Sequence, residues 1–223
     1  LTSNKVEPEE KEDDPDAPWS IYKPTVLPTE KGVNRVNWDL KMAGPSIIPG
    51  AKNDFGTPHA GPLAAPGGYT LRLTVDGKIL TTQVQVKPDP RVREDDLELA
   101  ERQALAVRTR DAISRVAHTV VALQKVRRQI VERTALLARF PEHKAITEEG
   151  RHLAAQLNEL EKGLHNPEAK VAYDILAKKG GAKLYSQFTS LYYDVIGSDG
   201  PATQGMREVF ADLDGKLQRL EEE

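Results

Sequence analysis

The sequence predicts an α+β protein in which an antiparallel β-sandwich is followed by an antiparallel α-helical bundle. Residues 69–75 alternate apolar and polar side chains without a break, which is typical of a strand with one buried face. Asp76-Gly77 follows directly, and this dipeptide favours a two-residue hairpin turn because both positions need a positive φ. From residue 94 to residue 222, apolar residues instead recur at helical spacing.

The β region is expected to occupy residues 31–91. A first strand is predicted around Trp38, where apolar and polar residues alternate imperfectly. One further short strand is expected between residues 44 and 68, in a stretch rich in glycine and proline turns. A two-residue turn at 76–77 pairs residue 75 with 78, 73 with 80, 71 with 82 and 69 with 84. This register puts the apolar side chains of both strands on one face.

The helical bundle is expected to occupy residues 92–223. A heptad track of apolar residues from Leu99 to Leu137 predicts one continuous helix of about 40 residues, which is ~60 Å long. A second track, from Ile146 to Leu164, predicts its antiparallel neighbour. A short helix is expected after Asn166-Pro167, and two more follow from residues 184 and 201. Short connections between long amphipathic helices favour a bundle.

Residues 1–30 are predicted to form an acidic, proline-rich loop or extension. Residues 1–18 carry two lysines against seven acidic residues, a net charge of −5 within a chain whose net charge is −3. Trp19 and Tyr22 are candidate anchor points for an interaction in this segment. The rest of the chain is close to neutral and aromatic residues are 5% of the total, so nucleic acid is not an expected partner.

The composition excludes several chemistries. The chain has no cysteine, which rules out disulfides, thiolate catalysis and zinc–thiolate sites. The five histidines are scattered, and no catalytic or phosphate-binding motif occurs. We therefore expect no catalytic residue, no metal and no cofactor. No apolar run reaches the roughly 18–20 residues that a membrane span needs.

Basic residues concentrate on the long predicted helix, where Arg127 and Arg128 are the candidate interaction residues. Arg127 falls on the apolar heptad track, which is unusual for a charged side chain. An ordinary charged helix face is the favoured interpretation, and a binding surface for an acidic partner is the alternative.

Several stretches resemble the C-terminal region of bacterial sortilin-like, neuraminidase-repeat β-propeller proteins, which are often labelled glycosyl hydrolases. The resemblance lies in residues 32–41, 66–78 and 86–91, and more loosely in the tail, residues 201–213. It implies a large propeller followed by an immunoglobulin-like domain and a helical bundle, in an exported protein that is periplasmic, secreted or on the cell surface. Any ligand or hydrolase site would lie on the propeller, outside these residues.

The resemblance also implies that the sandwich begins upstream of the acidic segment. The immunoglobulin-like sandwich of this chain is therefore expected to be incomplete. An unpaired sheet edge is a liability. The missing strands are expected to come from the upstream part of the same protein, which carries the propeller, or from another chain.

These observations predict a non-catalytic accessory or scaffold module that docks on a β-propeller or a partner protein in an exported or cell-surface assembly. One alternative is part of a glycosyl-hydrolase-like enzyme whose active site lies on the absent propeller. The other is a carbohydrate-binding module, which needs exposed aromatic rings. An exposed Trp38 would favour sugar binding, and a buried Trp38 would favour a scaffold.

Overall fold

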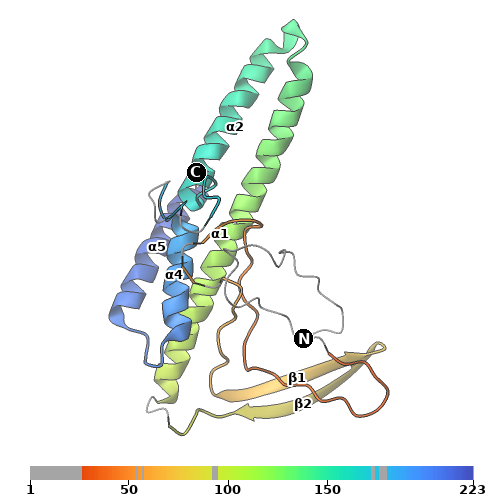
Figure 1. Ribbon diagram of the computed structural model, residues 1–223, viewed down its shortest axis with the longest axis vertical. Helices are drawn as coiled ribbons and strands as arrows, with labels where there is room; N and C mark the ends of the chain where they lie inside the picture. Colours follow the sequence, from red (N-terminus) through yellow and green to blue (C-terminus); the bar gives the residue numbers. More distant parts are fainter. Residues whose placement is uncertain are drawn as a thin grey trace.

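The computed structural model describes residues 27–53, 55–56, 58–91, 95–171, 174–175 and 180–222. Four helices and a two-stranded antiparallel sheet make up its main elements, so the α+β prediction is confirmed. In chain order they are β1 (Gly67–Val75), β2 (Lys78–Val86), α1 (Asp96–Leu137), the 3₁₀ helix η1 (Pro141–His143), α2 (Lys144–Leu164), α4 (Leu184–Gly197) and α5 (Gln204–Glu222). Helix α1 runs almost the length of the molecule, with the hairpin at one end (Figure 1).

Helix α1 is the 42-residue helix that the heptad track predicts. It begins with a capping box, in which the Glu98 amide donates to the Asp95 carboxylate at 2.8 Å and the Asp95 amide donates to the Glu98 carboxylate at 3.3 Å. Every apolar member of the track is buried or half-buried. These members are Leu99, Ala106, Ile113, Val116, Val120, Leu123, Ile130 and Leu137. The heptad pattern therefore predicts the buried face of α1 correctly over the whole helix.

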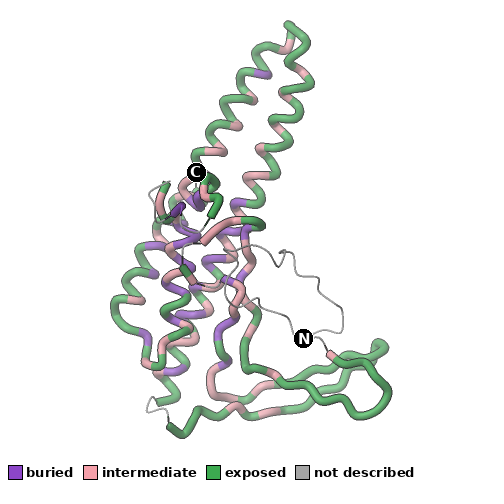
Figure 2. Tube along the Cα trace, in the orientation of Figure 1, coloured by how far each residue is buried: buried purple, intermediate pink, exposed green. Residues whose placement is uncertain are grey.

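The hydrophobic core lies where the first half of α1 packs against α4 and α5 (Figures 1 and 2). Phe188 of α4 is fully buried, and its ring meets the ring of Phe210 of α5 at 6.2 Å in an edge arrangement. The other large hydrophobic side chains of this core with almost no exposure are Ile113, Val116, Val120, Leu164, Tyr192, Val195 and Leu217. The predicted helical bundle is therefore present. The short helix expected after Asn166-Pro167 does not begin there, because residues 167–171 form turns and bends; Asp174 and Ile175 are helical, and residues 172–173 and 176–179 lie outside the described residues.

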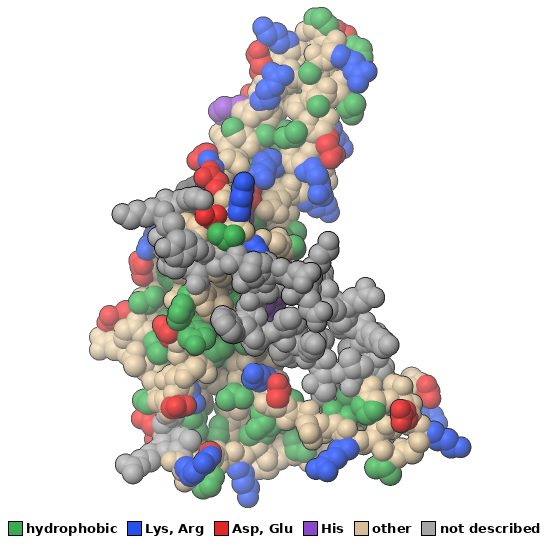
Figure 3. Space-filling model, in the orientation of Figure 1, with side chains coloured by type: hydrophobic (Ala, Val, Ile, Leu, Met, Phe, Trp, Pro, Cys, Tyr) green, Lys and Arg blue, Asp and Glu red, His purple; other side chains and the backbone are tan. Residues whose placement is uncertain are grey.

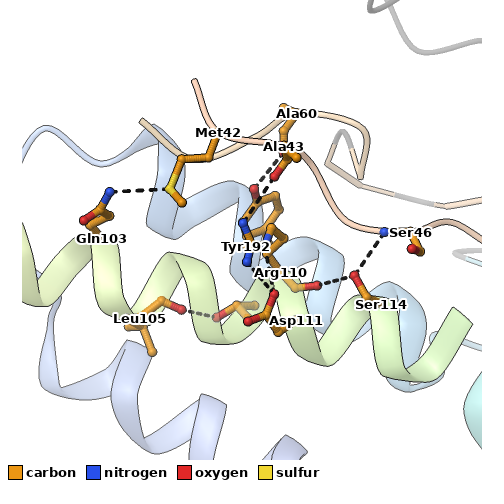
Figure 4. A network of polar contacts seen from close by, with 11 residues as sticks. Met42, Ala43, Ser46, Ala60, Gln103, Leu105, Arg110, Asp111, Ser114 and Tyr192 are labelled. Atoms are coloured by element: carbon orange, nitrogen blue, oxygen red, sulfur yellow. Dashed lines mark hydrogen bonds and ion pairs between the residues drawn. The ribbon is translucent and has the colours of Figure 1, made fainter. Parts of the chain in front are cut away.

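The loop before the hairpin is held against this core by side chains of α1 and α4 (Figure 4). Ser46 donates its amide to the Ser114 hydroxyl at 3.0 Å, and the Tyr192 hydroxyl donates to the Ala60 carbonyl at 2.7 Å. The Tyr185 hydroxyl accepts from the Ile48 amide at 3.3 Å. The loop thus satisfies its backbone groups on the bundle instead of in a sheet.

The hairpin has the predicted register. Strands β1 and β2 pair antiparallel with Val75 opposite Lys78 and Leu73 opposite Leu80. Asp76 and Gly77 have φ values of 48° and 76°, as a two-residue turn of this type requires. Just after the hairpin, the Asp89 carboxylate accepts hydrogen bonds from the backbone amide and the guanidinium group of Arg91.

The predicted sandwich is not found in the described residues, where β1 and β2 are the only strands. The prediction of a strand around Trp38 is wrong, because residues 33–39 form no strand within the described part of the chain. The expected short strand between residues 44 and 68 is reduced to one isolated bridge between Lys41 and Leu63. Two strands are too few for an immunoglobulin-like sandwich.

Local side-chain hydrogen bonds explain why the strand predicted around Trp38 does not form. The Asn34 amide group donates to the Glu30 carbonyl at 2.9 Å, and the Trp38 indole donates to the Lys41 carbonyl at 3.0 Å. The Asp39 carboxylate accepts from the Lys41 amide at 3.0 Å. Such contacts compete with a strand ladder for the same backbone groups.

Residues 40–44 and 59–64 run so close together that only glycine fits at two positions. The Met42 amide donates to the Pro62 carbonyl at 2.8 Å. A Cβ on Gly61 would lie 1.7 Å from the Met42 carbonyl oxygen, and one on Gly44 would lie 2.2 Å from the His59 oxygen. Neither backbone oxygen can move aside as a flexible side chain could.

We expect Gly61→Ala to lower the free energy of unfolding by about 1–3 kcal/mol, because the added methyl forces the two segments apart. Gly197→Ala is the control, since nothing lies within 4 Å of a Cβ there, and its effect should be neutral or slightly stabilising. Urea unfolding followed by circular dichroism measures both. Equal stabilities for the two variants would contradict the close approach.

Candidate interaction surface on the helical arm

A buried carboxylate joins α1 to α2 in the C-terminal third of α1. Glu161 of α2 has a side chain that is 1% exposed, and it forms an ion pair with Arg127 of α1. The Gln124 amide group donates to the same carboxylate at 2.8 Å, and a ring nitrogen of His165 lies 2.9 Å from it. Arg127 also donates to the Asn158 side chain at 2.8 Å. A buried ion surrounded in this way fixes how α1 and α2 align.

The environment of Glu161 decides its charge. Burial acts to raise the pKa of this carboxyl, while the hydrogen bonds from Gln124 and His165 and the positive charge of Arg127 act to lower it. The lowering contributions prevail, so the pKa of Glu161 lies below its ordinary value of 4.5. Glu161 is therefore an anion at neutral pH, and Arg127 is its counter-ion.

Of the four residues that the sequence singled out, the structure describes two. Arg127 is turned toward Glu161 and Asn158, while the neighbouring Arg128 is exposed. Trp19 and Tyr22 lie outside the described residues. Sequence reasoning missed Glu161 entirely, although an arginine on an apolar track was a signal that a buried acid faces it.

Beyond this ion pair, α1 and α2 continue together away from α4 and α5 (Figure 1). We call residues 121–157, a range that includes Arg127 itself, the arm. Most of its surface is exposed, in contrast to the buried body below it (Figure 2). Seven large hydrophobic side chains on the arm are 42–60% exposed. They are Val121, Val126, Val131, Leu136, Phe140, Ile146 and Leu153.

The arm is also basic. It carries seven lysine and arginine residues against four glutamates, a formal net charge of +3, although the charge of Arg127 is balanced by Glu161, which lies just outside the arm. Their side chains are spread over the arm, between the apolar ones (Figure 3). A shallow groove of about 620 Å³ follows α2 on one side, lined by Leu153, Gln156, Leu157, Leu160 and Leu220. Exposed apolar side chains interleaved with positive charge suit a protein surface that is acidic and partly apolar.

Trp38 does not present a free ring in the way that a sugar-stacking tryptophan does. It is half-buried, its indole N–H is bound to the Lys41 carbonyl, and its ring packs at 5.8 Å against Tyr69 in an edge arrangement. A cavity of about 350 Å³ lies nearby, between the base of the hairpin and α1. Arg102 in its wall donates to the Ser198 and Gly200 carbonyls at 2.8 and 2.9 Å.

The buried tyrosines of α4 serve as anchors for the loop. Burial raises the pKa of Tyr185 to about 12 and also raises the pKa of Tyr192. Both phenols therefore stay protonated and hold the loop backbone through hydrogen bonds. Within the part of the chain that the structure describes, no cluster of three or more histidine or acidic side chains could hold a metal ion.

Comparisons with protein-family models, with curated proteins and with solved structures returned no match. Among the described helices, none combines the length and apolar character that crossing a membrane requires.

Glu161→Leu should lower the free energy of unfolding by about 3 kcal/mol. This is the low end of the cost of breaking a buried pair, because the Arg127 side chain is 29% exposed. The double variant Glu161→Leu/Arg127→Leu should recover most of that loss, since it leaves no unpaired charge behind. Urea unfolding of the four proteins of this cycle measures the coupling. Additive effects of the two substitutions would show that the pair does not interact.

The same carboxylate makes stability depend on pH. A pKa that is lower in the folded state than in the unfolded state stabilises the fold fully above the unfolded value, and this contribution is lost as the pH falls through the folded value. The unfolding free energy of the wild type should therefore fall more steeply than that of Glu161→Gln between about pH 5 and about pH 3. Urea midpoints across this range test the difference, and parallel curves would refute it.

Proposed function

We propose that this chain is a non-catalytic scaffold module that presents the arm to a partner protein whose surface is acidic and partly apolar. The observation that carries the proposal is the arm itself, with seven large hydrophobic side chains at 42–60% exposure and a net charge of +3. An arm that exposes this many large apolar side chains favours a role in binding. The body below holds the arm in place through the ion pair between Arg127 and Glu161.

The partner that we propose is a β-propeller of the same protein, or another chain of an exported or cell-surface assembly. What supports this choice is the likeness of residues 32–41 and 66–78 to the region that follows the propeller in sortilin-like proteins. The immunoglobulin-like assignment of the β region rests on the same likeness and stays a prediction. Hydrolase activity would then belong to the propeller.

The proposal predicts that substitutions on the arm abolish partner binding without unfolding the body. Val131→Asp/Leu136→Asp adds two negative charges to side chains that are 51% and 60% exposed, so the fold should tolerate it. The matched control is Leu97→Asp/Val209→Asp, at body positions that are 67% and 48% exposed. Each protein would be tagged and cross-linked in extracts of its native source, and the captured proteins would be identified by mass spectrometry.

The expected result is an acidic partner that the wild type and the control retain, that the arm variant loses, and whose capture weakens as salt is raised. Capture that is equal for all three proteins would place binding elsewhere. Hydrolysis of glycosides by the isolated chain would overturn the scaffold proposal and favour the enzyme alternative.

A further inference from the structure

The second strand of the hairpin is an open sheet edge. In the described residues, β2 pairs with β1 and with no other strand. All of its residues except Val84 and Val86 are exposed, and these two are half-buried. The hairpin extends away from the end of the molecule where α1 begins, so the helices do not cover its outer part (Figure 1). An exposed edge of this length is a template for pairing with another strand.

The register of the hairpin decides which backbone groups of β2 face outward. Val75 and Lys78 flank the two-residue turn and form its first hydrogen-bonded pair, and such pairs alternate along an antiparallel ladder. The amides and carbonyls of the intervening residues therefore point away from β1. On β2 these residues are Ile79, Thr81, Gln83 and Gln85. Their backbone groups are donors and acceptors for a further strand.

The composition of β2 favours pairing, whereas that of β1 opposes it. From Ile79 to Val86 the sequence contains no charged residue and no proline, which are the residues that natural proteins use to protect an edge. The isoleucine, threonine and valine residues of this stretch favour extended structure. Strand β1 instead carries Arg72 near its middle and two glycines at its start. The open edge of β2 is therefore the better template.

Strand β2 is also complementary to a second copy of itself. Antiparallel pairing about a two-fold axis at Thr82 places Leu80 opposite Val84, and Thr81 opposite Gln83, of the second copy. Apolar side chains then meet apolar ones, polar side chains meet polar ones, and no like charges oppose each other. Because paired residues lie on the same face of the sheet, the apolar faces of the two hairpins become continuous.

We propose that two copies of this chain associate through β2 in this register, which joins their hairpins into a four-stranded antiparallel sheet. A second copy is the favoured occupant because its own β2 matches this edge in charge and in side-chain type. Three or more strands are what a small sheet needs to be stable, and the hairpin alone has two. A single pair of strands buries less surface than the roughly 1,200 Å² at which stable interfaces begin, so the dimer should be transient. The proposal does not rest on the proposed function of the arm.

Sedimentation velocity of the full chain tests the association, at protein concentrations from about 1 µM to about 1 mM, which cover transient interfaces. We expect the weight-average sedimentation coefficient to rise with concentration toward that of a dimer. Thr81→Lys/Gln83→Lys should raise the dissociation constant about tenfold, because a lysine at residue 81 of each copy then opposes a lysine at residue 83 of the other. Both side chains are exposed, so the hairpin should tolerate the change.

Thr81→Lys/Gln83→Glu is the matched control. It keeps the same lysine opposite Arg72 within the hairpin, but in the proposed register it places opposite charges against each other between the copies. It should dimerise at least as tightly as the wild type. A wild type that stays monomeric over the whole concentration range would overturn the proposal. So would equal weakening by the two variants, or a dimer that Thr81→Lys/Gln83→Lys leaves intact, because the contact would then lie elsewhere.

Discussion

The buried carboxylate of Glu161 is the constraint on which the rest of the structure depends. It can remain charged in the interior only while Arg127, Gln124 and His165 surround it. Arg127 and Gln124 lie on α1. Glu161 lies in α2, and His165 directly follows that helix. The ion therefore requires one alignment of the two helices. A slip of α2 along α1 would separate these partners and leave the charge unpaired.

Because α2 has a single alignment on α1, the two halves of α1 can have different roles. The first half of α1 is buried by α4, α5 and the loop that Tyr185 and Tyr192 hold in place. Its second half contacts α2 and otherwise faces water. Without this contact, α2 could shift along α1, and the apolar side chains of the arm would not keep one arrangement. A partner that binds the arm meets a surface that the body has already organised, which lowers the entropic cost of association.

The helices and the hairpin were predictable because their signals are local. Heptad spacing and the Asp76-Gly77 turn act within a few residues, and the structure follows them. The Trp38 strand was not predictable, because a strand needs a partner, and side chains such as Asn34 and Asp39 hold their own backbone in the absence of one.

The burial of Glu161 could not be predicted from the sequence for a related reason. Glu161 lies beside Leu160 in a sequence where charged residues alternate with apolar ones, and a glutamate on such a helix normally faces solvent. Its burial follows from the position of Arg127, 34 residues earlier in the chain. The sequence showed Arg127 on the heptad track. Its partner Glu161 is identified only by the packing of α2 against α1.

Native-state hydrogen exchange along α1 tests the role of this ion pair most directly, because it shows where the rigid body ends. If Glu161 fixes α1 against α2, amides should keep the high protection of the core from residue 106 through Arg127, and protection should fall only beyond it, toward Leu137. A loss of protection that begins at Val116 or Val120, before the ion pair is reached, would contradict this account.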